Sequence, residues 1–190
     1  KSRARVMGIP KNRLITQQIE EAIVEAHGFD LLTMGRPEGQ SCYCYVNNLV
    51  RQALASLRAN YSVTVVDNEA GMEHLSRMNT DDVDCLALVC EPTVVSARSA
   101  VRIARLADSL DVTVGRRVLV WNKVTGAGVP AQARRIAGEY AFEDAVELPF
   151  DDAVADLSAS EKSVFPSAAP EGFARLAETC IVNIRQAGIG

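Results

Sequence analysis

Cys42 and Cys44, separated by one residue, are the side chains of this sequence best suited to bind a soft metal ion. Two thiolates supply only half of a tetrahedral coordination shell, so a closed site needs two further ligands. A second copy of the chain could supply them through its own two cysteines. The spacing therefore predicts a metal site between two subunits, and zinc and nickel are the candidate ions.

Asp67 and Gly71 are the candidate catalytic residues. Asp67 ends the apolar segment 62–67, and Gly71 follows four residues later. In nucleotide hydrolases an acidic residue after a strand holds Mg²⁺, often through water, and a glycine lets a backbone N–H approach the terminal phosphate. The alternative is that Asp67 caps the next turn, with Gly71 supplying the geometry of that turn.

Two further predicted strands end in residues that suit a purine base. Asn122, next to Lys123, offers both a donor and an acceptor to the edge of a base. After the predicted strand over 145–148, Pro149 fixes the backbone and Phe150 offers an apolar face to the ring of a purine base; Asp151 follows. Simple turns explain each group equally well, so the nucleotide hypothesis depends on all the strand ends together.

The order of predicted elements positions these residues. Apolar, β-rich segments alternate with segments of helical period, which predicts an α/β fold with a mostly parallel, doubly wound sheet. Ligands of such sheets bind beyond the carboxyl ends of the strands. We interpret all 190 residues as one nucleotide-binding domain. The expected strands cover 29–34, 62–67, 84–90, 117–121 and 145–148, the expected helices cover 16–26, 47–58, 96–109, 130–140 and 171–186, and the loop-like stretches are 126–130 and 158–170.

The composition of the chain argues against some classes of binding partner. The 24 acidic and 20 basic residues give a net charge of −4 without a block of like charge, which argues against binding to nucleic acid or to an anionic membrane. The apolar runs fall short of the roughly 20 residues that span a bilayer, and no signal peptide opens the sequence. We therefore expect a cytoplasmic location, where Cys85, Cys90 and Cys180 stay reduced and fill the core.

Three stretches together resemble a known family: 32–39, the Cys-Tyr-Cys sequence at 42–44, and the sequence VDNEAGMEHLSR at 66–77. They look like the CooC-type accessory ATPases of carbon monoxide dehydrogenase maturation, which belong to the nitrogenase-iron-protein and MinD-like group of P-loop ATPases. The resemblance extends from about Phe29 to the end of the chain. The combination of Cys-x-Cys with the acidic, glycine-containing stretch after the strand is specific to this family.

The resemblance implies an ATP-dependent homodimer that loads nickel into the metal cluster of carbon monoxide dehydrogenase. It also implies ATP or ADP with Mg²⁺ as cofactors. By position, the family's metal ligands match Cys42 and Cys44, its magnesium-associated acid matches Asp67, its switch glycine matches Gly71, its adenine-reading amide matches Asn122, and its loop around the base matches Pro149, Phe150 and Asp151.

The sequence departs from the family in one respect. Members open with a strand and a Gly-x-x-x-x-Gly-Lys-Ser/Thr phosphate loop, and this motif does not occur within the 190 residues. We expect a natural chain that extends by roughly 60–75 residues before Lys1, an estimate that rests on the family resemblance and on the typical sizes of βαβ units. The alternative is a P-loop-less, non-hydrolytic metal-binding dimer or scaffold of the same pathway. A partition- or division-type ATPase would give no reason for the paired cysteines.

Overall fold

The computed structural model describes the smaller part of the chain's first third and most of the remainder. The described residues are 17, 21–33, 53–57, 59–68, 82–110, 113–161 and 171–182. They fall in two compact units, which are treated separately. The smaller unit comprises Lys1–Asn68 and Arg77–Asn79, and the larger unit comprises Glu69–Ser76 and Thr80–Gly190.

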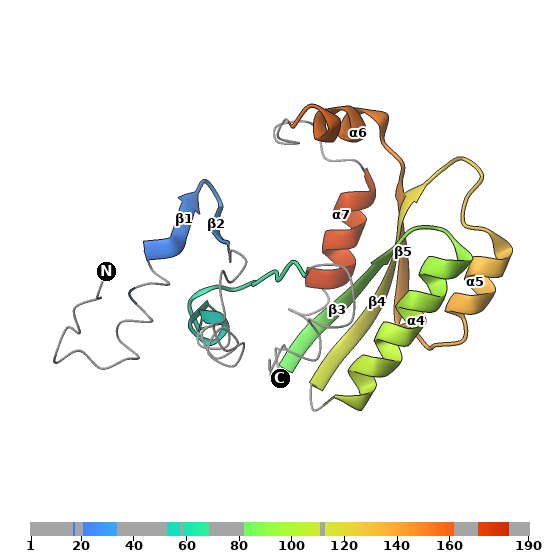
Figure 1. Ribbon diagram of the computed structural model, residues 1–190. Helices are drawn as coiled ribbons and strands as arrows, with labels where there is room; N and C mark the ends of the chain where they lie inside the picture. The colour runs from blue at the N-terminus through green and yellow to red at the C-terminus, as the bar shows by residue number, and fades with distance from the viewer. Residues whose placement is uncertain are drawn as a thin grey trace, which may run out of the picture. The chain divides into compact units, whose positions relative to one another are not determined.

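The larger unit is built on a three-stranded parallel sheet (Figure 1). Its strands are β3 (Asp82–Cys90), β4 (Thr113–Val124) and β5 (Asp144–Pro149), in the order β3-β4-β5. Valines, leucines and other apolar residues dominate all three, as expected for strands that are covered on both faces. The predicted α/β fold with a parallel sheet is thus confirmed, with each of these three strands longer than its predicted range.

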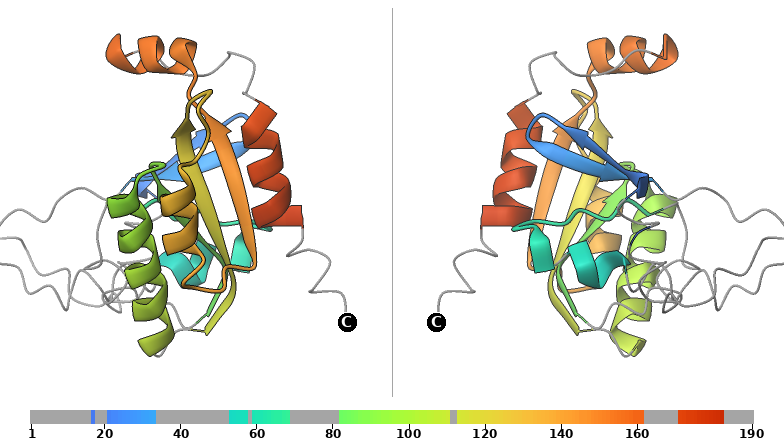
Figure 2. Two further views of the ribbon diagram at one scale, coloured as in Figure 1. Left: turned by 90° about the vertical axis from the view of Figure 1, so that its right-hand side faces the viewer. Right: turned by 90° about the vertical axis from the view of Figure 1, so that its left-hand side faces the viewer.

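Helices cover both faces of this sheet (Figure 2). Helices α4 (Val94–Ser109) and α5 (Ala131–Ala137) lie on one face, and α7 (Glu171–Ala177) lies on the other. Each helix falls within or close to a range that the helical period predicts. The crossovers β3-α4-β4 and β4-α5-β5 are the βαβ units that the alternation of elements indicated.

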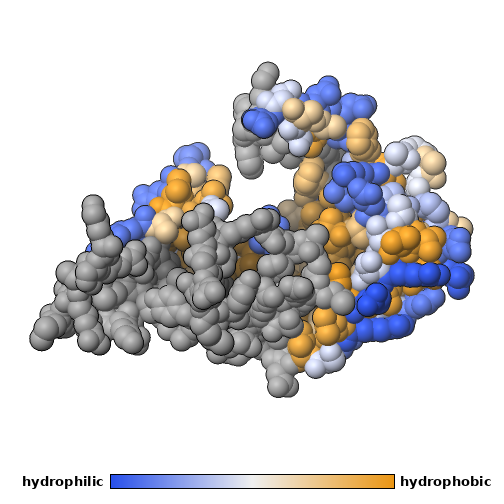
Figure 3. Space-filling view, viewed as in Figure 1, coloured by the Kyte–Doolittle hydropathy of each residue, from blue (hydrophilic) through white to orange (hydrophobic). Residues whose placement is uncertain are grey.

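Helix α4 approaches the sheet closely because small side chains occupy its inner face. Thr93 starts the helix: its Oγ1 accepts a hydrogen bond from the backbone N–H of Ser96 at 3.1 Å. On the side of the molecule where α4 and α5 lie, Figure 3 shows hydrophilic surface next to hydrophobic surface. The buried residues of α4 are Ala97, Ala100, Val101, Ala104 and Ala107.

Two apolar clusters form the core, one on each face of the sheet. Trp121, the only tryptophan of the chain, is 2% exposed and belongs to the cluster beneath α4 and α5. The second cluster lies beneath α7, where Leu176 packs against it. The alternation of side chains along β4 and β5 divides the two clusters. The buried members of the second cluster are Val118, Val120, Val146 and Leu148.

Two elements near the end of the chain were not foreseen in full. Helix α6 (Asp152–Ala159) follows β5 and buries none of its side chains, so it has no apolar stripe that a periodicity argument could detect. Helix α7 continues as a π-helical turn, η1 (Glu178–Val182). The predicted helix over 171–186 is confirmed across α7, and its last residues lie outside the described ranges.

The smaller unit contains an antiparallel hairpin. Strands β1 (Ile23–Ala26) and β2 (Phe29–Leu32) pair through a short turn in which Gly28 has a φ of +90°. The expectation of a helix over 16–26 is therefore wrong for its last four residues. The strand expected over 29–34 is present at 29–32, but its partner is antiparallel and adjacent in sequence. A positive φ at Gly28 favours the hairpin over a continuing helix.

The strand expected over 62–67 is not formed. Residues 61–68 adopt neither helix nor strand, and Val65 is 81% exposed. An isolated extended segment gains no ladder of hydrogen bonds, so its β-branched residues alone do not make it a strand. Tyr61, just before it, donates a hydrogen bond to the Asp30 carboxylate. Helix is present at 53–57, within the range predicted for it.

Candidate functional site

The carboxyl ends of β4 and β5 lie side by side and form the candidate site. Val124 pairs with Pro149 in the parallel ladder, and the backbone N–H of Phe150 donates to the Val124 carbonyl at 2.8 Å. These bonds hold the two segments that leave the sheet at the same edge. Parallel α/β sheets bind ligands at this edge, which makes it the place to look for a site.

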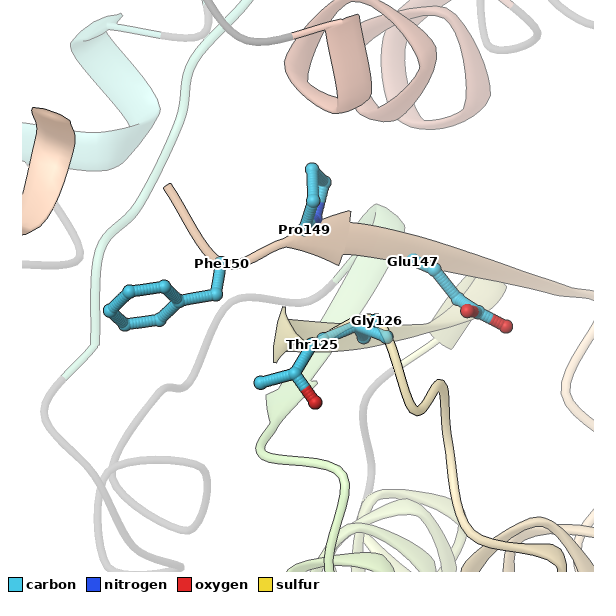
Figure 4. A pocket seen from close by; sticks show the side chains of 6 residues that line it. Thr125, Gly126, Glu147, Pro149 and Phe150 are labelled. Atoms are coloured by element: carbon cyan, nitrogen blue, oxygen red, sulfur yellow. The ribbon is translucent and has the colours of Figure 1, made fainter. Parts of the chain in front are cut away.

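An open pocket lies at this edge (Figure 4). It has a cavity volume of about 450 Å³, within the range of roughly 300–1,000 Å³ typical of small-molecule sites. In Figure 4, Thr125 and Gly126 lie in the middle, with Phe150 to the left and Glu147 to the right. The lining residues are Val124, Thr125, Gly126, Glu147, Pro149 and Phe150.

Pro149 and Phe150, predicted as base-binding residues, both line this pocket. The Phe150 ring is 45% exposed, so one of its faces remains accessible to a ligand. The Asp151 Oδ1 accepts a hydrogen bond from the Val154 N–H at 3.1 Å and so caps helix α6. Asp151 does not line the pocket.

Asn122 and Lys123 form an irregularity just before the pocket. Four residues of β4, from Trp121 to Val124, lie opposite three residues of β5, from Glu147 to Pro149, which is the geometry of a β-bulge. Lys123 has a φ of 60°, a left-handed conformation that is uncommon for a residue with a Cβ atom. The Asn122 Oδ1 accepts a hydrogen bond from the Lys123 N–H at 3.0 Å. Neither side chain lines the pocket, although Val124 follows directly.

Two ion pairs join this edge to neighbouring segments. The Lys123 Nζ lies 2.9 Å from Glu91 Oε1, directly after β3, and the Arg134 Nη2 of α5 lies 2.6 Å from Glu147 Oε1. The sequence analysis did not select Glu91, Arg134 or Glu147. A charged residue within an otherwise apolar strand was the available signal for Glu147, and the position after a predicted strand was the available signal for Glu91.

Three further cysteines lie half-buried against the core, as expected. Cys90 packs against the cluster beneath α4, and burial raises its pKa to about 11. Burial, followed by the nearby thiol of Cys180, raises the pKa of Cys85 to about 12. A thiol with a raised pKa is protonated at neutral pH and is therefore a poor nucleophile and a poor metal ligand.

The remaining candidate residues belong to the smaller unit or are not among the described residues. Asp67 belongs to the smaller unit, where it is exposed in a segment without regular structure. Cys42, Cys44 and Gly71 lie outside the described residues. Within the described ranges, no three His, Cys, Asp or Glu side chains come together as a metal site would require. None of the helices in those ranges combines the length and the hydrophobicity needed to cross a bilayer.

The fold and the pocket together define an α/β domain with a candidate ligand site at the carboxyl edge of a parallel sheet, consistent with a P-loop NTPase-like domain. The chain is 42% identical over 117 residues to an uncharacterized ATP-binding protein of Methanocaldococcus jannaschii. These 117 residues are 62% of the chain and 46% of that protein. A second uncharacterized ATP-binding protein of the same organism is 30% identical over 146 residues, 75% of the chain and 56% of that protein.

A third relative is the carbon monoxide dehydrogenase accessory protein CooC of Rhodospirillum rubrum. It is 35% identical over 96 residues, which are 49% of the chain and 36% of that protein. The chain thus spans about half the length, or less, of the curated relatives it matches. No protein-family model matches the chain, and no solved structure gives a significant match.

Proposed function

We propose that this chain forms part of an ATP-binding protein and that the pocket between β4 and β5 receives the adenine base. The observation that carries the proposal is the convergence of Pro149 and Phe150 on a pocket at the carboxyl edge of a parallel sheet. The similarity to proteins named as ATP-binding supports the same ligand.

The described residues fit a base better than they fit phosphates. Pro149 and Phe150 provide apolar surface to the pocket. Asn122, the predicted adenine-reading amide, does not line the pocket, and its Oδ1 accepts a hydrogen bond from the Lys123 N–H. The Gly-x-x-x-x-Gly-Lys motif that would cradle phosphates is not among the 190 residues. ATP, when bound, would supply the free energy of hydrolysis to conformational change. The part of this chain is to bind and orient the base.

Phe150 provides the direct test of the base site. Replacing Phe150 with alanine in the natural protein should weaken ATP binding by about tenfold or more, since stacking of a base on an aromatic ring contributes about 1–3 kcal/mol. Phe173 of α7 is the matched control, because it is 44% exposed, against 45% for Phe150, and does not line the pocket. Isothermal titration with Mg–ATP measures both variants. Equal affinities of F150A and F173A would contradict the base site.

We further propose the finer role of a CooC-type maturation factor. In this role a homodimer binds zinc or nickel through Cys42 and Cys44 of both subunits, and nickel is the cargo for carbon monoxide dehydrogenase. Asp67 would associate with Mg²⁺ and Gly71 would approach the terminal phosphate. The similarity to the CooC protein of Rhodospirillum rubrum and the Cys-x-Cys spacing support this proposal.

Metal content tests the finer role separately. The double variant C42S/C44S should lose stoichiometric zinc or nickel and show a weaker metal-dependent dimer, measured by elemental analysis and by mass in solution. Cys90→Ser is the control, because its thiol is half-buried against the core and has a raised pKa. Unchanged metal content in the double variant would contradict the metal site. Metal binding without ATP binding would favour the non-hydrolytic scaffold.

A further inference from the structure

Glu147 is the one charged residue among the six that line the pocket. Its neighbours in β5, Val146 and Leu148, belong to the core cluster beneath α7, so Glu147 projects from the opposite face of the strand. Its carboxylate is 39% exposed. An ionised carboxylate at the edge of an apolar pocket accepts charge-assisted hydrogen bonds and donates none.

Arg134 fixes the orientation of this carboxylate. The Arg134 Nη2 contacts Glu147 Oε1 at 2.6 Å, and no described residue forms a hydrogen bond with Glu147 Oε2. The ion pair therefore holds one carboxylate oxygen and leaves the other for a donor on a ligand. Charge-assisted hydrogen bonds of this kind are about twice as strong as bonds between neutral groups.

The apolar and acidic parts of the pocket lie on different sides. Figure 4 shows Phe150 and Glu147 on either side of Thr125 and Gly126. A planar ring lying over Thr125 and Gly126 would meet the phenyl group at one side and the carboxylate at the other. The ring atom that faces Glu147 must then be a hydrogen-bond donor, and adenine carries such a donor in its exocyclic amino group.

We propose that Glu147 is a specificity-determining residue that selects a base with an exocyclic amino group, adenine in particular, by accepting a hydrogen bond from that group. This inference rests on the proposed nucleotide function and adds the means of base selection. Hypoxanthine, the base of ITP, has a carbonyl oxygen where adenine has the amino group. A carboxylate repels that oxygen, so Glu147 discriminates against ITP as well as favouring ATP.

The test compares ATP, ITP and GTP with the natural protein and two variants, by isothermal titration. The natural protein should bind ATP at least about tenfold more tightly than ITP, since a hydrogen bond to a charged group contributes about 1.5–3 kcal/mol. In E147A this preference should disappear, because ATP loses its hydrogen bond and ITP loses the repulsion: ATP affinity should fall, and ITP affinity should rise. Glu139→Ala, an exposed glutamate just after α5, should retain the preference.

Different results would contradict the role of Glu147, the assignment to adenine and the proposed function. Equal affinities of the natural protein for ATP and ITP, or an equal loss of both in E147A, would overturn the role of Glu147 and leave the base pocket intact. Tighter binding of GTP than of ATP would overturn the assignment to adenine, because guanine carries its amino group on another ring atom. No binding of any of the three nucleotides would overturn the proposed function itself. Emission of Trp121 reports whether E147A is folded. If it is not, E147Q replaces it: the glutamine amide can accept from the amino group of adenine or donate to the carbonyl of hypoxanthine, so the preference for ATP should again disappear.

Discussion

The Lys123 ammonium lies 2.9 Å from the Glu91 carboxylate, and this ion pair connects the residue after β3 to the bulge at the end of β4. Both side chains are more than half exposed, so the pair itself contributes little to stability. Its effect is instead local, because it ties down a lysine whose backbone has a φ of 60°. Strained conformations of this kind persist where surrounding contacts impose them, and they occur often near ligand sites.

The backbone strain at Lys123 predicts an unusual order of stability. Lys123→Gly and Lys123→Ala both remove the ammonium group, but only glycine adopts a positive φ without steric cost. We expect the glycine variant to be more stable than the alanine variant by about 1 kcal/mol, measured by urea unfolding followed through Trp121 emission. Gln132 of helix α5 is the control, where glycine should be the less stable of the two. A more stable alanine variant at position 123 would contradict the strained backbone.

The backbones of β3 and β4 approach closely at Gly115, so this position leaves no room for a side chain. A Cβ atom at Gly115 would lie 2.8 Å from the backbone oxygen of Asp84, which is too close for van der Waals contact. We expect Gly115→Ala to lower the free energy of unfolding by about 1–3 kcal/mol, because the two strands must move apart. Gly126→Ala is the control, since a Cβ there meets no atom within 4 Å, and its effect should stay within about 0.5 kcal/mol. Equal effects of the two changes would contradict the strand spacing.

The larger unit was predictable because its strands are fully covered. Apolar runs such as those of β4 and β5 need no partner information to be identified, and the ends of parallel strands necessarily meet at one edge. Pro149 and Phe150 were selected from their place after a predicted strand, from their chemistry and from the family resemblance; both line the pocket, and their role in binding a base stays a prediction. The confirmed part of the prediction is the part that depends on burial and on sheet geometry.

The remaining features depend on contacts that spacing does not encode. The bulge at Lys123 changes which residues face the pocket, and a sequence pattern of period two has no means of marking one extra residue. Glu147 acquires significance only through Arg134, thirteen residues earlier on another element. The apolar segment at 62–67 shows the converse, since β-branched residues without a pairing strand remain exposed.

Asp151 has two competing interpretations that a pair of variants separates. As the cap of α6, its side chain accepts from the Val154 N–H, and asparagine can replace it while alanine cannot. We expect Asp151→Ala to weaken α6 by about 1 kcal/mol and Asp151→Asn to leave it nearly unchanged. Because α6 buries no side chain, the loss should appear as faster amide exchange within α6 and not as global unfolding. A loss of ATP affinity in both variants with unchanged exchange would instead favour a role at the base.

The pKa of the Cys85 thiol predicts how stability changes at alkaline pH. Burial, and then the adjacent Cys180 thiol, raises this pKa from 9.0 to about 12, while Arg116 lowers it by a smaller amount. The folded state therefore keeps the thiol protonated in a pH range where the unfolded chain ionises. The contribution of Cys85 to stability is complete below pH 9 and is lost as the pH rises from about 9 to about 12.

A comparison with Cys85→Ala isolates this contribution from the tyrosines and lysines that ionise in the same range. Urea unfolding of both proteins at pH 8 and at pH 10.5, followed through Trp121 emission, gives the loss of unfolding free energy for each. We expect the natural protein to lose more stability between these two values than the variant does, because the variant has no thiol at this position to ionise in the unfolded chain. An equal loss in the two proteins would mean that the Cys85 thiol is as accessible to water in the folded state as in the unfolded state.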